Sequence, residues 1–313
     1  MKEFQPMVQP TNAAVTIKQD QSNIIKDSFE LPTLLAVGGL LQAVTLLILP
    51  VRYALLPLGF LLGRSIITTI LETRSLSSKP FNPSIVHGIT TAQLPLSGGS
   101  TSSSTTTTGL QANFGTTSAS SPVVVFHLGV YFNHPLGFLA PGSKEIGGHF
   151  SAMEKDLLAN RSSNGLISSS SWRGTTRSSK NCVLLIAYFR SAEDLNHFAH
   201  SKTHRDGWNW YNKFVRESGY HHFGLFHETF VSPKGEWESI YIDCEPTLLG
   251  GGSVRIGQGE KEGGEEHQAE EQVGNEDKDD KEVWIRPLVN AKHPALRTQA
   301  KRMSSLLGLR EEV

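Results

Sequence analysis

The sequence CVLLIAYFRSAEDLNHFAHSKTHRDGWNWY, residues 182–211, decides the fold. Its apolar opening run, Cys182–Phe189, predicts a strand. Ser191, with Asp194 three residues later, is typical of a helix N-terminus. At about 100° per residue, one arc of the helix that follows collects His, Trp and Tyr side chains and one valine: His197, His200, His204, Trp208, Tyr211 and Val215. Because another face is apolar and suits a core, this arc is a candidate wall of a ligand cavity.

Two plainer interpretations of this arc stay open. Aromatic side chains at helical spacing equally suit a hydrophobic core or a subunit interface, and three histidines on one face can be ordinary hydrogen-bonded side chains. The loop-like segment Ser201–Asp206 can also break the helix, which would separate the members of the arc.

Composition argues against several function classes. The 313 residues carry a formal net charge of −1, whereas a nucleic-acid-binding protein normally shows a basic domain or stripe. Two cysteines, Cys182 and Cys244, make no disulfide framework. The sequence contains no GxGxxG after a strand, no Walker A sequence, no HExxH and no GxSxG. Nucleotide cofactors, serine hydrolysis and a nucleic-acid partner are therefore not expected.

Residues 31–75 are predicted to form a membrane anchor or hairpin, after a flexible tail at 1–30. Leu31–Pro50 contains no charge and has about the 20-residue length of a transmembrane helix. Three membrane arrangements stay open: one span ending near Pro50, a re-entrant hairpin, or a helix in the interface. A buried helix of a soluble domain is the remaining alternative, and Ser65–Ser78 is expected to continue as a short surface helix. Cations flank both sides, so the positive-inside rule gives no orientation: Lys18, Lys26, Arg64 and Arg74.

A folded domain is expected over residues 122–250. A disordered Ser/Thr-rich linker at 76–121 precedes it, and a disordered acidic insertion at 251–282 and a C-terminal docking segment at 283–313 follow it. Within the domain, the patterns predict strand, helix, strand, strand, helix, strand and strand: Val123–Pro135, Ser143–Leu158, Gly165–Trp172, Cys182–Phe189, the segment from Ser191, His221–Val231 and Trp237–Cys244.

The first six of these elements match an α+β, ferredoxin-like βαββαβ unit. Its antiparallel sheet would carry both helices on one face. The other face then needs cover, and a second copy of the sheet would supply it. We therefore expect a homodimeric α/β-barrel domain, preceded by the N-terminal membrane-associated helical segment.

Several segments of this domain together resemble one known family. They are NHPLGFLAPGSKEIGGHFSAMEKDL (133–157), GLISSSSW (165–172), YFRSAEDLNHFAHSKTHRDGWNWYN (188–212), HFGLFHETF (222–230) and GEWESIYIDCEPTLLG (235–250). These sequences are similar to the fungal monooxygenase family typified by the fumagillin-pathway enzyme. The resemblance also covers the apolar N-terminal segment and the sequence WIRPLV at 284–289. The chain departs from the family in its Ser/Thr-rich and acidic insertions, which lie outside these motifs.

The resemblance implies a dimeric α/β-barrel related to the antibiotic-biosynthesis monooxygenases. It also implies oxidation of a lipophilic secondary metabolite, of the polyketide or terpenoid type, with O2. Relatives in this superfamily oxidise without metal or flavin, and some others bind haem. No cofactor is therefore expected, with haem as the alternative.

Cofactor-free oxygenation needs an apolar pocket, a base that makes a substrate carbanion, and donors for the developing oxyanion. The catalytic candidates are His200 or His204 as base, Arg205 as donor, and His227. The candidates for substrate binding supply donors, walls, the pocket mouth or a carboxylate that orients a histidine: Asn133, His134, Trp208, Tyr211 and Glu228. Plainer roles stay open for these residues, since Arg205 can pair with Asp206 or Glu228, and Asn133 with His134 can simply build a turn.

Two other readings of the site also stay open. A single histidine, His204 or His227, can be an axial ligand of haem, or His200, His204 and His227 together can hold a metal ion. The domain can alternatively bind a lipophilic ligand without catalysis. We expect an endomembrane-associated protein with its catalytic domain in the cytosol, so the glycosylation sequon at Asn160 should be silent.

Overall fold

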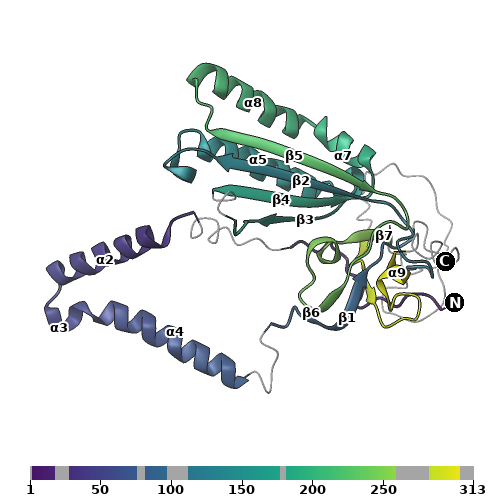
Figure 1. Cartoon of the computed structure of the whole chain (residues 1–313), viewed down its shortest axis with the longest axis horizontal. Helices are drawn as coiled ribbons and strands as arrows, with labels where there is room; N and C mark the ends of the chain where they lie inside the picture. Colours follow the sequence, from purple (N-terminus) through teal and green to yellow (C-terminus); the bar gives the residue numbers. More distant parts are fainter. Residues whose placement is uncertain are drawn as a thin grey trace, which may run out of the picture. The chain divides into compact units, whose positions relative to one another are not determined.

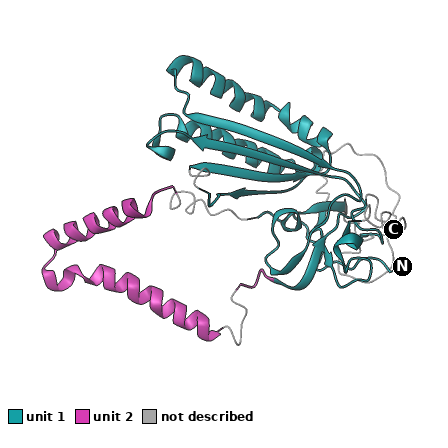
Figure 2. Ribbon diagram, in the orientation of Figure 1, with its two compact units in different colours: residues 1–19, 86–313 teal, residues 20–85 magenta. Residues whose placement is uncertain are grey.

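The computed structural model describes residues 2–17, 28–75, 82–96, 112–176, 181–258 and 282–303. The chain forms two compact units, one of residues 1–19 and 86–313 and the other of residues 20–85 (Figure 2). The predicted acidic insertion lies outside the described residues from 259 to 281, as does the Ser/Thr-rich sequence from 97 to 111.

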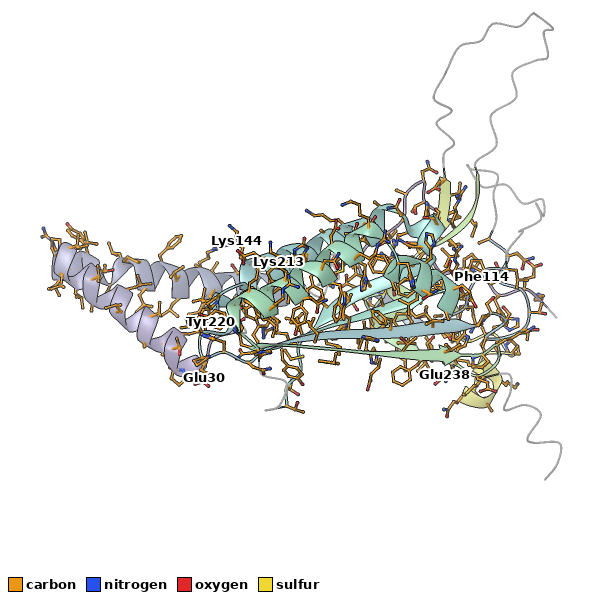
Figure 3. All side chains as sticks on the ribbon, turned by 90° about the horizontal axis from the view of Figure 1, so that it is seen from above. Glu30, Phe114, Lys144, Lys213, Tyr220 and Glu238 are labelled. Carbon is orange, nitrogen blue, oxygen red and sulfur yellow. The ribbon has the colours of Figure 1, made fainter. Side chains whose placement is uncertain are left out.

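The larger unit is built on a four-stranded antiparallel sheet in the order β3-β4-β2-β5 (Figure 1). Its strands are β2 (Val123–Phe132), β3 (Leu166–Trp172), β4 (Cys182–Phe189) and β5 (Phe223–Ser232). Helix α5 (Ser143–Ala159) connects β2 to β3, and helices α7 (Ala192–Ala199) and α8 (Lys202–Ser218) connect β4 to β5. Figure 3 shows these helices on one side of the sheet. The predicted ferredoxin-like α+β order is confirmed.

Short helices complete the connections of this domain. The 3-10 helix η1 (Gly137–Leu139) follows β2, and α6 (Arg161–Asn164) follows α5. The buried side chains of the sheet's helix-facing side pack against α5 and α7, as Val124, Leu157 and Phe198 show in one cluster. Alternate residues of a strand point to the same face of the sheet, so every second residue of these strands faces the helices.

The long helix expected after β4 is divided. Helix α7 ends at Ala199 with His200 as its C-cap. Ser201 is the N-cap of α8, and its side-chain oxygen accepts a hydrogen bond from the His204 backbone N–H at 3.2 Å. A second N-cap therefore stops the first helix after only eight residues. The single predicted arc is wrong for His197 and His200, whereas His204, Trp208 and Tyr211 remain together on α8 at the spacing i, i+4, i+7.

A second, smaller sheet belongs to the same unit and runs β6-β1-β9. Its strands are β1 (Val86–Ala92), β6 (Tyr241–Cys244) and β9 (Leu288–Asn290), while β7 (Val254–Gln258) pairs with β8 (Glu282–Ile285). The predicted last strand, Trp237–Cys244, is thus shorter and lies in this sheet. The 3-10 helix η3 (Leu248–Gly251) lies between β6 and β7 in the sequence, and α9 (Gln299–Arg302) is the last described element.

The expected flexible tail and linker are wrong for the parts that the structure describes. Phe4 and Phe114 are buried at 2% and 1% exposure, in a cluster with Val289. Strand β1 lies in the predicted linker and is paired on both edges. Both segments acquire structure only through partners distant in sequence, which local patterns do not reveal.

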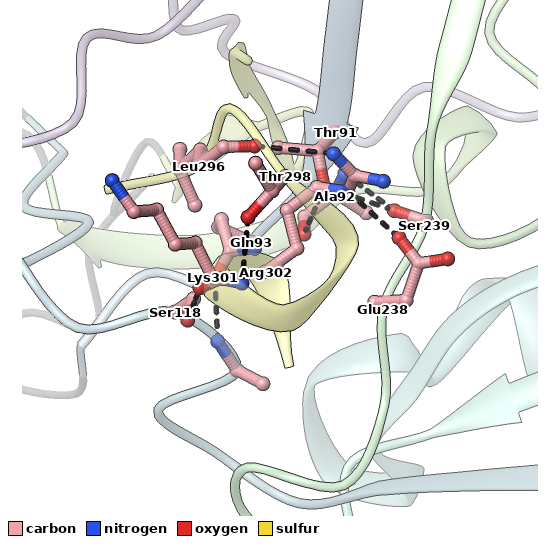
Figure 4. Close-up of polar contacts among 11 residues, drawn as sticks. Thr91, Ala92, Gln93, Ser118, Glu238, Ser239, Leu296, Thr298, Lys301 and Arg302 are labelled. Atoms are coloured by element: carbon pink, nitrogen blue, oxygen red, sulfur yellow. Dashed lines mark hydrogen bonds and ion pairs between the residues drawn. The ribbon is translucent and has the colours of Figure 1, made fainter. Parts of the chain in front are cut away.

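Buried polar contacts hold the C-terminal segment in this unit (Figure 4). The Arg302 Nε lies 2.7 Å from Glu238 Oε2, and its Nη1 donates to the Leu296 carbonyl at 3.2 Å. The Ser118 hydroxyl donates to the Lys301 carbonyl at 2.5 Å. The segment after β9 is therefore part of the fold.

The smaller unit consists of α2 (Leu31–Ile48), α3 (Val51–Ala54) and α4 (Leu56–Ser75). The predicted surface helix at 65–78 is instead the second half of α4, as far as residue 75. No residue of α2 or α4 is buried, which disagrees with a buried helix of a soluble domain. Leu31–Ile48 and Val51–Ser75 are each long and apolar enough to cross a membrane.

Candidate active site

A cavity of about 920 Å³ lies between the sheet and helices α5, α7 and α8. Phe126 and Leu128 of β2 line it together with apolar residues of the neighbouring strand β4. In the register of the sheet, Leu128 pairs with His227 and Phe126 with Thr229, so these two residues of β5 also reach the cavity. The size is in the usual range for small-molecule sites, and most of the lining is apolar.

His204 lies in the first turn of α8 and is half-buried at the cavity. Its ring lies near the Ala199 carbonyl and 5.9 Å from the Phe198 ring, edge to face. Burial lowers the pKa of His204, and the nearby His200 and His227 lower it further, although the Ala199 carbonyl acts in the opposite direction. The imidazole is therefore neutral at neutral pH and can accept a proton.

Three other predicted residues share this cavity. His227 stands on the edge strand β5, with its ring centroid 5.8 Å from that of Phe126. Trp208 and Tyr211 stack along α8 with their centroids 5.8 Å apart, and the Tyr211 hydroxyl donates to the Phe223 carbonyl at 3.2 Å. Since His227 and Trp208 are exposed, the cavity reaches solvent beside β5.

Glu228 does not belong to this site. Its neighbour His227 faces the helices, so Glu228 points to the opposite face of the sheet, where its Oε2 lies 3.9 Å from His127 Nδ1. The prediction that Glu228 orients a histidine of the site is wrong, because adjacent residues of a strand alternate between faces.

His200 and Arg205 are exposed and do not line the cavity. The Nδ1 atom of His200 lies 2.8 Å from the Asn196 carbonyl, at the end of α7. Asp206, a predicted partner of Arg205, instead pairs with Lys202 at 2.6 Å. The predicted positions of His200 and Arg205 in the site are therefore wrong, since the helix break turns them away from the cavity.

Asn133 and His134 build a turn rather than the mouth of the cavity. The Asn133 N–H donates to the His222 carbonyl at 2.7 Å, and the His134 ring accepts from the Leu136 N–H at 3.1 Å. The His134 carbonyl also accepts from Gly137 N–H at 2.8 Å. Neither residue lines the cavity, so the plainer alternative for this pair holds.

Sequence reasoning missed the polar residues that other helices contribute. His149 and Glu154 of α5 and Asn196 of α7 line the cavity. His149 stands 5.2 Å from the Trp210 ring, centroid to centroid. In the sequence, His149 and Glu154 border the apolar stripe of Ser143–Leu158, so the helical period of that segment contained the signal.

Among the described residues, no three His, Cys, Asp or Glu side chains are placed to hold a metal ion. The metal-site alternative formed by His200, His204 and His227 is therefore wrong, because His200 lies outside the cavity. Haem held by one axial histidine needs no such group and stays a prediction.

The strand order and the cavity between sheet and helices define a ferredoxin-like α+β domain with a small-molecule site. The profile of the family described as Monooxygenase af470-like matches residues 123–249. Monooxygenase af470 of Aspergillus fumigatus is 35% identical over 282 residues, which cover 90% of this chain and 90% of that relative. The chain belongs to the af470-like monooxygenase family and is an oxidoreductase of the monooxygenase class. The resemblance drawn from the sequence is confirmed.

Solved structures with a local likeness include two enzymes. A crystal structure of aldoxime dehydratase OxdRE with butyraldoxime is 19% identical, with a TM-score of 0.32, over 40% of this chain and 36% of that chain. SnoaB, a cofactor-independent oxygenase from Streptomyces nogalater, is 14% identical, with a TM-score of 0.24, over 34% of this chain and 90% of that chain.

Proposed function

We propose that the chain is a membrane-tethered monooxygenase that oxidises a lipophilic secondary metabolite with O2, without metal or flavin. The observation that carries this proposal is the large apolar cavity that contains a half-buried histidine, His204, whose pKa is lowered by burial. A neutral base in an apolar site suits removal of a proton from an acidic C–H group, as polyketide-type substrates offer. A terpenoid with a similarly activated C–H group would fit the same site.

In the proposed reaction, His204 takes a proton from a methylene group beside a carbonyl or an aromatic ring. The resulting carbanion donates its electrons to O2, a C–O bond forms, and the His204 imidazolium returns the proton to give a hydroperoxide. Loss of water from the hydroperoxide leaves a carbonyl group on the former methylene carbon. One oxygen atom enters the product and the other leaves as water, so no further reductant is required.

The other cavity residues position the substrate in this proposal. Trp208 and Tyr211 form one wall, and His227 faces the cavity from β5. The Tyr211 hydroxyl is already engaged with the β5 backbone, so the ring rather than the hydroxyl contributes. His227, exposed at the opening, can donate to the developing oxyanion.

The proposed enzyme is a homodimer through the face of the sheet that carries no helices. Phe226 and Phe230 of β5 and Trp172 of β3 are exposed there at 37%, 49% and 42%. Large apolar side chains gathered on one face are typical of protein–protein interfaces. A second copy of the sheet would cover these side chains, which supports the proposed dimer.

The membrane tether is residues 31–75. A lipid-dissolved substrate accounts for both the apolar helices of this segment and the apolar lining of the cavity. Haem-dependent catalysis and passive ligand binding are the alternatives against which this function is tested.

The test uses the full chain purified in detergent. We expect an absorption spectrum without a Soret band, no stoichiometric metal, and O2 uptake with lipophilic substrates that carry an acidic methylene group. The product should contain one atom from labelled O2 and lack the two hydrogens of that methylene. A Soret band or bound metal would favour the haem alternative. Binding without O2 uptake would favour a non-catalytic protein.

A further inference from the structure

The apolar helices interrupt a single folded unit. Before them, Thr11 and Trp284 exchange two backbone hydrogen bonds of 2.8 Å, and Pro6 bridges Val289. After them, β1 pairs with both β6 and β9. Residues 1–19 and 86–313 therefore belong to one compact unit, and residues 20–85 form an insertion within it.

This connectivity limits how the insertion can meet a bilayer. A folded unit cannot lie on both sides of a membrane, so the chain must leave the bilayer at the face where it entered. One span ending near Pro50 would place the bridge Thr11–Trp284 across the membrane. A cleaved signal sequence would remove Phe4, whose side chain is only 2% exposed in the folded unit.

The helix lengths match two crossings. Helix α2 has 18 residues, or about 27 Å at 1.5 Å per residue, against a hydrocarbon core of about 30 Å. Val51–Ser75 has 25 residues. The apolar side chains of α2 are exposed on all sides, with Leu47 at 87%.

The turn between the helices suits a membrane surface. Pro50 is the N-cap of α3, which carries Arg52 beside Tyr53, with the guanidinium carbon 4.8 Å from the ring centroid. Arginine keeps its charge in the headgroup region, where tyrosine is also enriched. The only amide side chain of α2, Gln42, donates to the Ala54 carbonyl at 3.0 Å, so it closes the hairpin.

We infer that residues 31–75 form a helical hairpin that crosses a bilayer twice, with Arg52 and Tyr53 at the far face. The inference rests on the proposed membrane tether. Both ends of the hairpin then lie at the same membrane face. The positive charges of both flanks therefore favour the same orientation under the positive-inside rule. The flanks carry Lys18, Lys26, Arg74 and Lys79, against one cation at the tip. By the positive-inside rule, the folded unit faces the cytosol.

Arg64 is the residue of the hairpin that opposes insertion most strongly. It lies near the middle of α4 and is exposed. A charge at this depth is costly unless its long side chain reaches the headgroups. The variant Arg64→Leu should therefore strengthen membrane retention and leave the topology unchanged.

The test labels cysteines in the full chain, expressed in yeast and recovered in sealed, cytosol-outward microsomes. Native Cys244, which is half-exposed, reports the folded unit, and Ala13→Cys in a Cys244→Ser background reports the segment before the hairpin. Tyr53→Cys in the same background reports the tip. Native Cys182 is buried and serves as the unlabelled control. The probe is a membrane-impermeant polyethylene-glycol maleimide, applied before and after permeabilisation.

We expect Cys244 and Ala13→Cys to react before permeabilisation, and Tyr53→Cys to react only afterwards. Reaction of all three before permeabilisation would overturn the double crossing. Opposite behaviour of Ala13→Cys and Cys244 would show a single span and overturn the hairpin, and reaction of both only afterwards would overturn the cytosolic orientation. Release of the wild-type chain by alkaline carbonate would instead refute the tether on which the inference rests.

Discussion

Replacing His204 with glutamine tests the proposed base with little damage to the fold. The His204 ring is half-buried at the cavity, and a glutamine side chain is polar and of similar size. The free energy of unfolding should therefore change by no more than about 1 kcal/mol. The glutamine side chain cannot accept the substrate proton, so only the chemistry should suffer.

The expected loss in kcat is about 10²- to 10⁴-fold, the usual contribution of a positioned general base. This loss corresponds to roughly 3–5 kcal/mol of transition-state stabilisation. Steady-state O2 uptake measures kcat, and urea unfolding of the same preparation measures stability. Since the loss in activity exceeds any loss in folded protein, the two effects are separable.

The pH dependence adds a second readout. Burial lowers the pKa of His204 below its ordinary value of 6.5, so wild-type activity should persist below pH 6.5 and fall only as the pH passes through the lowered pKa. The glutamine variant should lack this acid limb. The matched control is His200→Gln, which is exposed and outside the cavity. It should keep kcat, and its acid limb should move toward higher pH, because the charge of His200 contributes to lowering the His204 pKa.

Two results would refute this reasoning. One is a His204→Gln enzyme that keeps a tenth or more of the wild-type kcat. The other is an acid limb that persists unchanged in that variant, which would assign the titration to another group of the cavity.

Four further substitutions follow from the packing. Phe230→Lys places a charge on the open sheet face, where Phe230 is 49% exposed, and light scattering should show monomer instead of dimer; a monomeric wild type would contradict the proposed interface. Gly207→Ala adds a Cβ at ordinary contact distance, 3.5 Å from His149, and should raise the free energy of unfolding by about 0.5–1 kcal/mol in urea. Gly142→Ala should instead lower it by more than about 1 kcal/mol, because φ is +81° and the Cβ would lie 2.7 Å from the Phe214 ring; equal effects of the two alanines would contradict the geometry. Arg302→Ala leaves the Glu238 carboxylate without its 2.7 Å partner and should cost about 3–5 kcal/mol, whereas a change below 1 kcal/mol would show that water replaces the pair.

The order of the ferredoxin-like elements was readable because each is marked by its own residues. Cys182–Phe189 has eight apolar or aromatic residues in a row and forms β4 over that same range. Ser143–Leu158 carries its apolar residues at helical spacing and forms α5 with one residue more. A helix or strand that buries one face has apolar residues at a regular spacing in its sequence, whichever element it packs against.

The second sheet was not readable for the opposite reason. Val86–Ala92 contains glycine and two threonines among few large apolar residues, and its strand form depends on pairing with β6 and β9. Those partners lie about 150 and 200 residues further along the chain. Pairing over such separations stabilises a segment whose local preference for a strand is weak.

In the candidate site, a predicted residue that lines the cavity (His227) and one that does not (Glu228) are adjacent. His227 and Glu228 are consecutive residues of β5, so their side chains point to opposite faces of the sheet. The sequence contains this alternation, but only the identity of the covered face decides which of the two enters the cavity. The packing of α5, α7 and α8 on one side makes that choice.

The helix break that removed His200 from the site also gives His204 its chemical character. Because Ser201 caps a new helix, His204 falls in the first turn of α8, directly after the carbonyl end of α7, where its ring lies near the Ala199 carbonyl. A carbonyl acceptor stabilises the protonated ring, whereas burial against Phe198 and the neighbouring histidines destabilises it. Burial is the larger effect, so the net result is a lowered pKa and a neutral imidazole at neutral pH. In an uninterrupted helix, His200 and His204 would share one face, four residues apart. The break leaves one of them exposed and places the other in an apolar cavity, which is the arrangement that a single general base requires.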